Sequence, residues 1–90
     1  MNPTLHVRIV SPRGVIFEDE TKSVSSKNSV GAFDILPQHA NFITIVENQP
    51  ISVIKADDTK EDFHFDLAII YTRNNQVSIF TDIRELPKLI

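Results

Sequence analysis

The chain of 90 residues contains no cysteine. This absence excludes disulfide bridges, thiolate zinc sites and cysteine nucleophiles. With only two glycines, the sequence also has no glycine-rich loop of the kind that cradles a phosphate. The formal net charge is −3, and no segment is rich in Lys or Arg. These features argue against nucleic-acid binding, which needs a basic surface, and they give no support for binding to an anionic membrane surface.

Long apolar runs are missing as well. The run at Leu67–Tyr71 is among the longest and covers only a few residues, whereas a membrane span needs about twenty. We expect no signal peptide at the first residues, Met1–Thr4, because no long apolar stretch follows a basic start. We therefore expect any link to a membrane to pass through another protein.

What the sequence does contain is a series of short segments typical of β-strands. Apolar residues make up 41% of the chain and charged residues 23%, which suits one small globular domain. Leu5–Ile9 alternates apolar and polar residues, the pattern of a half-buried strand. The further predicted strands are Val15–Phe17, Thr21–Lys27, Ala32–Leu36, Phe42–Val46, Ile51–Lys55, Phe63–Phe65, Ala68–Thr72 and Val77–Thr81.

Turn residues separate these segments. Ser11–Gly14, Asp57–Lys60 and Arg73–Gln76 read as turns, and we expect the chain also to break at Glu18–Glu20 and Asn48–Pro50. No window shows the apolar spacing of a helix. The sequence therefore predicts an all-β fold, a compact antiparallel β-sandwich of about nine to ten short strands. We expect this domain to span residues 1–83, followed by a short C-terminal tail at 84–90.

Residues that could carry chemistry are few. His64 and Asp66 would lie on one face of a strand, but two ligands do not make a metal site. The acidic pairs Asp57–Asp58 and Glu61–Asp62 flank a predicted exposed hairpin tip, where their pKa values would not separate as acid–base catalysis requires. No Gly-x-Ser-x-Gly elbow presents a nucleophile. We therefore expect no catalytic residue, no cofactor and no metal.

The segment Gly31–Thr44 carries the most specific pattern, with Pro37-Gln38-His39-Ala40 at its centre. It resembles the signature of the epsilon subunit of F-type ATP synthase, Gly-Glu-(Phe/Leu)-Gly-(Ile/Val)-(Leu/Tyr)-Pro-Gly-His-Ala-Pro-Leu-(Leu/Ile)-Thr, and it fits without a gap. The segments Leu5–Pro12 and Asn74–Asp82 are similar to the first and last sandwich strands of that family. The likeness covers about residues 4–83.

The sequence departs from the family signature at several positions. Ala32 stands where the family has an acidic residue, and Asn41 replaces a proline. Asp34 and Gln38 replace two glycines. Losing a glycine implies either changed backbone angles or strain where the angles are kept.

The resemblance implies a non-catalytic subunit of the central stalk, on the cytoplasmic side of the bacterial inner membrane. Such a subunit binds the gamma subunit and the c ring, and it couples proton or sodium translocation to ATP synthesis or hydrolysis. The positions implied to face gamma are Ser11, Gln38, His39, Ala40 and Thr44. The positions implied to approach the c ring are Gly31, Ala32 and Asp34.

The family also has a helical hairpin domain that carries inhibition and ATP sensing. Only eight residues follow Asp82, and Pro87 lies among them, so we expect this chain to lack that domain. Two other hypotheses stay open. One is a free-standing β-sandwich module that binds a peptide or small ligand, and the other is a small metal-dependent enzyme built on His39, His64 and Asp66.

Overall fold

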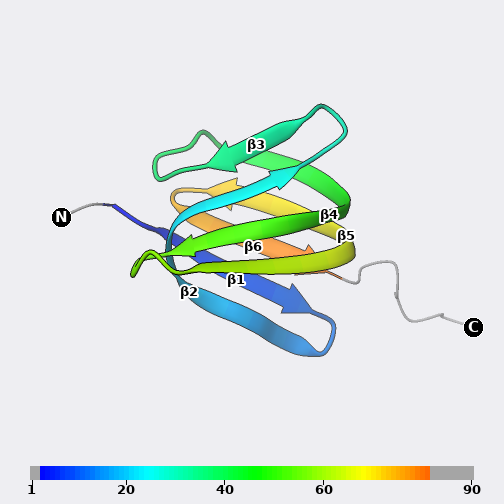
Figure 1. Ribbon diagram of the computed structural model, residues 1–90, viewed down its shortest axis with the longest axis horizontal. Coiled ribbons are helices and arrows are strands. Elements are labelled where there is room, and N and C mark those ends of the chain that lie inside the picture. Colours follow the sequence, from blue (N-terminus) through cyan, green and yellow to red (C-terminus); the bar gives the residue numbers. More distant parts are fainter. Residues whose placement is uncertain (1–2, 82–90) are drawn as a thin grey trace, which may run out of the picture.

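The computed structural model describes residues 3–81 and shows an all-β fold (Figure 1). No helix in this part of the chain is long and apolar enough to span a membrane. The expected domain boundary at residue 83 and the expected tail at 84–90 lie outside the described residues. The strands are β1 (Leu5–Ser11), β2 (Gly14–Lys27), β3 (Ala32–Ile35), β4 (Phe42–Lys55), β5 (Lys60–Arg73) and β6 (Gln76–Thr81).

The all-β prediction is confirmed, but the predicted number of strands is wrong. Residues 3–81 form six strands, because β2, β4 and β5 each run for 14 residues through a point where we expected a break. The charged stretch Glu18–Glu20 continues β2, since Glu18 pairs with Arg8 and Glu20 with His6 on β1. Opposite charges on neighbouring strands favour this pairing.

Pro50 was expected in a turn and instead lies inside β4, opposite His64. The hydroxyl of Ser26 on β2 donates a hydrogen bond to the carbonyl of Pro50, at 2.9 Å. This side of Pro50 therefore faces β2, and the backbone pairing of β4 with β2 starts only at Ser52. The missing N–H of proline thus removes no bond from the β4–β5 ladder, which explains why the strand continues.

The sheet closes on itself. Its strand order is β1-β6-β5-β4-β2-β3, and β2 also pairs with β1. The prediction of a wholly antiparallel fold is wrong in one pair, because β1 and β6 run parallel from His6↔Gln76 to Val10↔Phe80. A parallel pair cannot be joined by a tight turn. A long connection is available here, because β1 and β6 lie at opposite ends of the described chain and all other strands come between them.

The three long strands bend from one layer of the sandwich to the other (Figure 1). The first layer is formed by β1, β6, residues 42–47 of β4, residues 68–73 of β5 and the start of β2. The second layer is formed by β3, the end of β2, residues 51–55 of β4 and residues 60–65 of β5.

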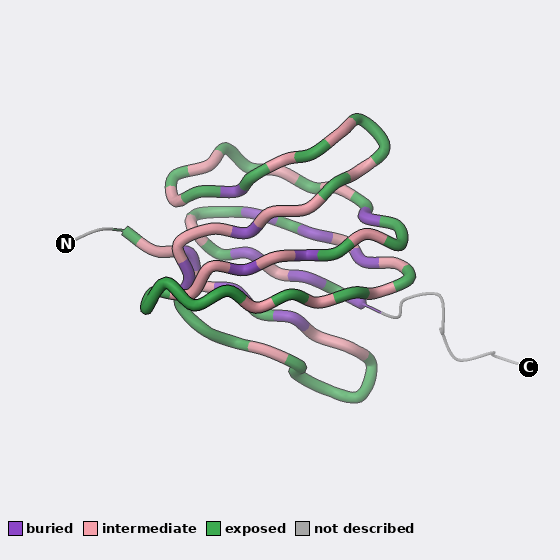
Figure 2. The backbone as a smooth tube through the Cα atoms, viewed as in Figure 1, coloured by how far each residue is buried: buried purple, intermediate pink, exposed green. Residues whose placement is uncertain are grey.

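The core lies between these layers (Figure 2). Alternate residues of each strand point inward, as in β1, where Leu5, Val7 and Ile9 are fully buried. Several partly buried phenylalanines pack against this buried cluster. The buried apolar residues are Leu5, Val7, Ile9, Val24, Ile35, Val46, Ile51, Val53, Ala68, Ile70, Val77 and Ile79.

A histidine held between two carboxylates joins β1 to β2. His6 Nδ1 lies 2.6 Å from Glu20 and Nε2 lies 2.7 Å from Glu18. Because only the protonated ring has an N–H on both nitrogens, this geometry suits the charged form. The hydrogen bonds that the His6 ring donates to Glu20 and then to Glu18 raise the pKa of His6 above its ordinary value. A hydrogen bond from Thr4, followed by one from His6, lowers the pKa of Glu20.

These shifts predict how this histidine affects stability at different pH values. The raised His6 pKa gives stabilisation that is full below 6.5 and is lost as pH rises through the raised value. The lowered Glu20 pKa gives stabilisation that is full above 4.5 and is lost as pH falls through the lowered value. The contribution is therefore largest between pH 4.5 and 6.5.

We expect His6→Gln to lower the free energy of unfolding within this window by no more than about 1 kcal/mol, since the groups are half exposed. The loss should shrink at alkaline pH. Urea unfolding across pH 4–9 measures it, with His64→Gln as a control on an exposed site. An equal loss at pH 5.5 and pH 9 would contradict the ionic explanation.

Thr72 generates a second prediction about stability. Its hydroxyl is buried and has no hydrogen-bond partner among the described residues. Replacing a buried unpaired hydroxyl with a methyl group removes a desolvation penalty, so Thr72→Val should raise the free energy of unfolding by about 1 kcal/mol. Thr21→Val is the matched control, because the buried Thr21 hydroxyl donates to the Leu5 carbonyl. Thermal unfolding should show opposite shifts, and a destabilised Thr72→Val would refute the prediction.

Candidate functional site

The loop Pro37–Ala40 connects β3 to β4 and is held by backbone hydrogen bonds. The Gln38 N–H donates to the side-chain oxygen of Asn75 at 2.6 Å. The His39 N–H donates to the Leu36 carbonyl at 3.0 Å. The first bond ties the loop to the turn between β5 and β6, so the signature residues are fixed on the sandwich rather than free.

The ring of His39 is also held in place. Its Nδ1 lies 2.7 Å from the carbonyl oxygen of Ala40. A carbonyl can only accept a hydrogen bond, so this nitrogen carries a proton. The ring meets Phe42 edge to face, with a centroid distance of 5.4 Å. The half-buried imidazole is thus oriented before any partner arrives.

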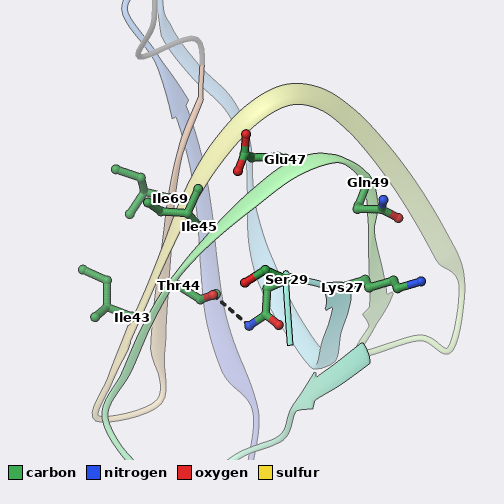
Figure 3. A pocket seen from close by; sticks show the side chains of 9 residues that line it. Lys27, Ser29, Ile43, Thr44, Ile45, Glu47, Gln49 and Ile69 are labelled. Carbon is green, nitrogen blue, oxygen red and sulfur yellow. Dashed lines mark hydrogen bonds between the residues drawn. The ribbon is translucent and has the colours of Figure 1, made fainter. Parts of the chain in front are cut away.

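Thr44 lies in β4 and binds the turn between β2 and β3. Its hydroxyl oxygen accepts a hydrogen bond from the side-chain amide of Asn28 at 2.9 Å (Figure 3). The side-chain oxygen of Asn28 accepts the N–H groups of Val30 and Gly31, at 2.9 and 3.1 Å. Asn28 therefore connects Thr44, which the resemblance implies faces gamma, with the turn that the resemblance implies approaches the c ring.

The three residues implied for the c ring lie on that hairpin. Gly31 has φ 148°, a conformation that glycine adopts far more easily than other residues. Ala32 and Asp34 are both exposed, while Phe33 between them points inward, so the two share one side of β3 as alternation requires. The Ser25 hydroxyl on β2 donates to the carboxylate of Asp34.

The two positions at which the family has glycine behave differently. Gln38 keeps a left-handed backbone with φ 68°, which costs about 1–2 kcal/mol for a residue with a Cβ. Asp34 lies in the extended strand β3 instead. Gln38 therefore carries backbone strain, whereas Asp34 has the ordinary angles of a strand.

Ser11 lies apart from the other residues implied for gamma. It ends β1, and its hydroxyl accepts the N–H of Arg13 at 3.2 Å within the β1–β2 turn. The strands β5 and β6 lie between β1 and β4 in the sheet. The structure therefore brings Gln38, His39, Ala40 and Thr44 to one region and leaves Ser11 three strands away.

An exposed apolar surface on the first layer was missed by the sequence reasoning. Ile43 and Ile45 are 67% and 54% exposed, and Tyr71 and Phe80 are 38% and 42% exposed. A signal for it was present, because Phe42–Val46 and Leu67–Tyr71 have apolar residues on both faces of the strand. A groove of about 690 Å³ runs between this face and the turn at 27–29 (Figure 3).

The residues of the metal-enzyme hypothesis do not form a site. His64 is exposed on β5 opposite Pro50, whereas His39 packs on Phe42 in the first layer. Within residues 3–81, no three His, Cys, Asp or Glu side chains are grouped so that they could hold a metal ion.

Comparison with known sequences gives a consistent result. A model of the beta-sandwich domain of the ATP synthase delta/epsilon chain matches residues 4–87. The ATP synthase epsilon chain of Clostridium botulinum is 32% identical over 85 residues, which are 94% of this chain and 63% of that one. The epsilon chain of Campylobacter fetus is 29% identical over 79 residues, 88% of this chain and 61% of that one. The chain thus spans less than two thirds of these relatives.

Two solved structures share the fold. A chain of the Euglena gracilis mitochondrial ATP synthase, in a structure of OSCP, F1 and the c ring, has a TM-score of 0.83 at 11% identity. The match covers 97% of this chain and 58% of that one. A chain of the Tetrahymena thermophila central stalk and c ring has a TM-score of 0.72 at 10% identity, covering 97% and 76%.

Sequence identities of 10–11% to these structures show a shared fold and no more. The sequence model, in contrast, is specific to one family. It covers nearly all of the chain, including every strand and the signature loop. The resemblance seen in Gly31–Thr44 is therefore confirmed. The chain belongs to the family of the beta-sandwich domain of the ATP synthase delta/epsilon chain.

Proposed function

We propose that this chain is a non-catalytic central-stalk subunit of a rotary ATP synthase. In this role it binds the gamma subunit and the c ring, and it couples proton or sodium translocation to ATP synthesis or hydrolysis. The observation that carries the proposal is the family match over residues 4–87. We place it peripherally on the cytoplasmic side of the bacterial inner membrane, which it reaches through the complex, as the resemblance implies.

The proposed gamma site comprises Gln38, His39, Ala40 and Thr44, with Ser11 at a distance. The loop and the His39 ring are held by hydrogen bonds and by the contact with Phe42. Side chains already ordered in the free protein lose little conformational entropy when a partner binds. This rigidity supports a role in recognition.

The proposed ring site comprises Gly31, Ala32 and Asp34. Ala32 brings no charge to this surface, and the Asp34 carboxylate on the same side is already hydrogen-bonded to Ser25. An exposed ion pair contributes only about 0–1 kcal/mol. We therefore propose that shape and backbone contacts contribute more to ring docking than charge does.

The gamma site can be tested by substitution. His39→Ala removes the ring that packs on Phe42, and Thr44→Arg places a long charged side chain beside Asn28. We expect each to weaken binding to the gamma subunit about tenfold, equivalent to about 1.4 kcal/mol. Co-purification with tagged gamma and titration of the isolated proteins measure the effect.

His64→Ala is the control for this experiment, because His64 is exposed on the second layer. It should bind gamma like the wild type. Unchanged binding of folded His39→Ala and Thr44→Arg would show that the loop only stabilises a local turn. Failure of the wild type to bind any gamma subunit would refute the proposed function and favour a free-standing binding module.

The ring site predicts a weak dependence on ionic strength. Asp34→Ala should lower binding to a purified c ring only about two- to threefold, within the range of one exposed ion pair. Reconstitution with the ring across a series of salt concentrations measures this, with Asp62→Ala on β5 as an exposed acidic control. A steep loss of binding as salt rises would show that charge dominates the contact.

A further inference from the structure

Asn75, in the turn between β5 and β6, holds two separate segments of the chain. Its backbone carbonyl accepts the N–H of His6 on β1 at 2.8 Å. Its side-chain oxygen accepts the N–H of Gln38 at 2.6 Å. Gln38 has a strained φ of 68°, and backbone strain persists only where neighbouring contacts hold it. The same turn therefore fixes both the start of β1 and the signature loop Pro37–Ala40.

The side chain of His6 can gain or lose a proton, and this changes its contacts. The ring contacts Glu20 through Nδ1 at 2.6 Å and Glu18 through Nε2 at 2.7 Å. Only the protonated ring can donate from both nitrogens, so loss of the proton removes one of the two bonds. The ring and the backbone N–H that binds Asn75 belong to the same residue. The protonation of the ring therefore affects how firmly β1 is held beside that turn.

The charged groups around the ring favour its protonated form. The two carboxylates that β2 presents on this side contact it directly. On β1, the Nε of Arg8 lies 3.8 Å from Glu18 and is thus already paired with an acid. On β6, the residue opposite His6 is the neutral Gln76, and Arg73 follows beyond it on β5. The contacting carboxylates raise the pKa of His6 above its ordinary value of 6.5, so the change in bonding falls above that pH.

We infer that the protonation of His6 controls how firmly the signature loop is held, through the two hydrogen bonds that Asn75 accepts. In the protonated form, both ring bonds fix the start of β1, and the turn stays in place. In the neutral form one ring bond is lost, the turn is held less firmly, and the bond from Gln38 breaks more often. The effect is modest, because the ring and both carboxylates are half exposed and such pairs contribute little.

The consequence for binding rests on the proposed function, which supplies the partner. Gln38 and His39 belong to the proposed gamma site, and a loop that opens more often loses more conformational entropy when gamma binds. Gamma should then bind more weakly as pH rises through the pKa of His6. Coupling of this kind is reciprocal, so bound gamma should also raise the affinity of His6 for its proton.

Amide hydrogen exchange of the isolated chain tests this control without gamma. The exchange rate of the Gln38 N–H, measured by NMR, is compared between the wild type and His6→Gln at the same pH. The glutamine side chain carries no charge and stands in for the neutral ring. We expect the N–H to exchange about threefold faster in His6→Gln at pH 5.5, and at the wild-type rate at pH 9. Equal rates in the two proteins at both pH values would overturn the inference.

The Asp58 N–H is the matched control in the same spectra. Asp58 also has a positive φ, 72°, and its N–H donates to the Lys55 carbonyl at 2.9 Å in the turn between β4 and β5. Its exchange rate should be the same in the wild type and in His6→Gln. An equal acceleration at Asp58 and Gln38 would show a general loss of stability, which contradicts control of one loop.

Two further variants test the route through the turn. Asn75→Gly removes the side chain that binds Gln38, while glycine still adopts the positive φ of 62°. In this background, His6→Gln should no longer change the exchange rate of the Gln38 N–H, and a change that persisted at full size would refute the route. Glu20→Gln removes one carboxylate partner and carries the comparison if His6→Gln fails to fold.

Titration with gamma at the two pH values separates the inference from the proposed function. The wild type should bind gamma about twofold more tightly than His6→Gln at pH 5.5 and equally tightly at pH 9. If the wild type binds no gamma, the proposed function fails, while the exchange rates still decide whether His6 controls the loop. If gamma binds and the ratio of the two affinities is the same at both pH values, His6 does not regulate binding and the inference is overturned.

Discussion

The parallel pairing of β1 with β6 is the contact on which the rest of the structure depends. It joins the first and last described strands, from His6↔Gln76 to Val10↔Phe80. A further backbone bond of 2.8 Å, from His6 to the carbonyl of Asn75, ties the start of β1 to the turn before β6. Without this pairing β1 would bond only to β2, and the first layer would end at an open edge on β6. Such edges invite unspecific association.

The same pairing positions part of the proposed gamma site. The Asn75 turn, positioned by this closure, holds Gln38 and with it the signature loop. The residues proposed to bind gamma are thus positioned by the closed sheet as a whole. The outer face of the first layer also exposes the apolar side chains of Ile43, Ile45, Tyr71 and Phe80.

The sequence predicted the local features of this fold well. Alternating residues such as Leu5–Ile9 identified strands, and the Asn74–Asn75 turn has the positive φ angles that its residues favour. It could not predict that β4 passes through Pro50, because that depends on which neighbour faces the missing N–H. The parallel closure, and with it the separation of Ser11 from Thr44, depends equally on contacts between residues far apart in the chain. The effect of a residue other than glycine at these two positions also had to be observed, since Gln38 has a strained positive φ angle and Asp34 does not.

The absence of cysteine allows a direct measurement of the central claim, that gamma binds at the signature loop. A single cysteine introduced as Gln38→Cys or as His64→Cys reports on the loop or on the second layer, through its rate of reaction with a soluble thiol reagent. In complex with gamma, the cysteine of Gln38→Cys should react at least tenfold more slowly than in the isolated chain, while that of His64→Cys keeps its rate. Equal rates for Gln38→Cys with and without gamma, in a complex shown to be intact, would contradict the account.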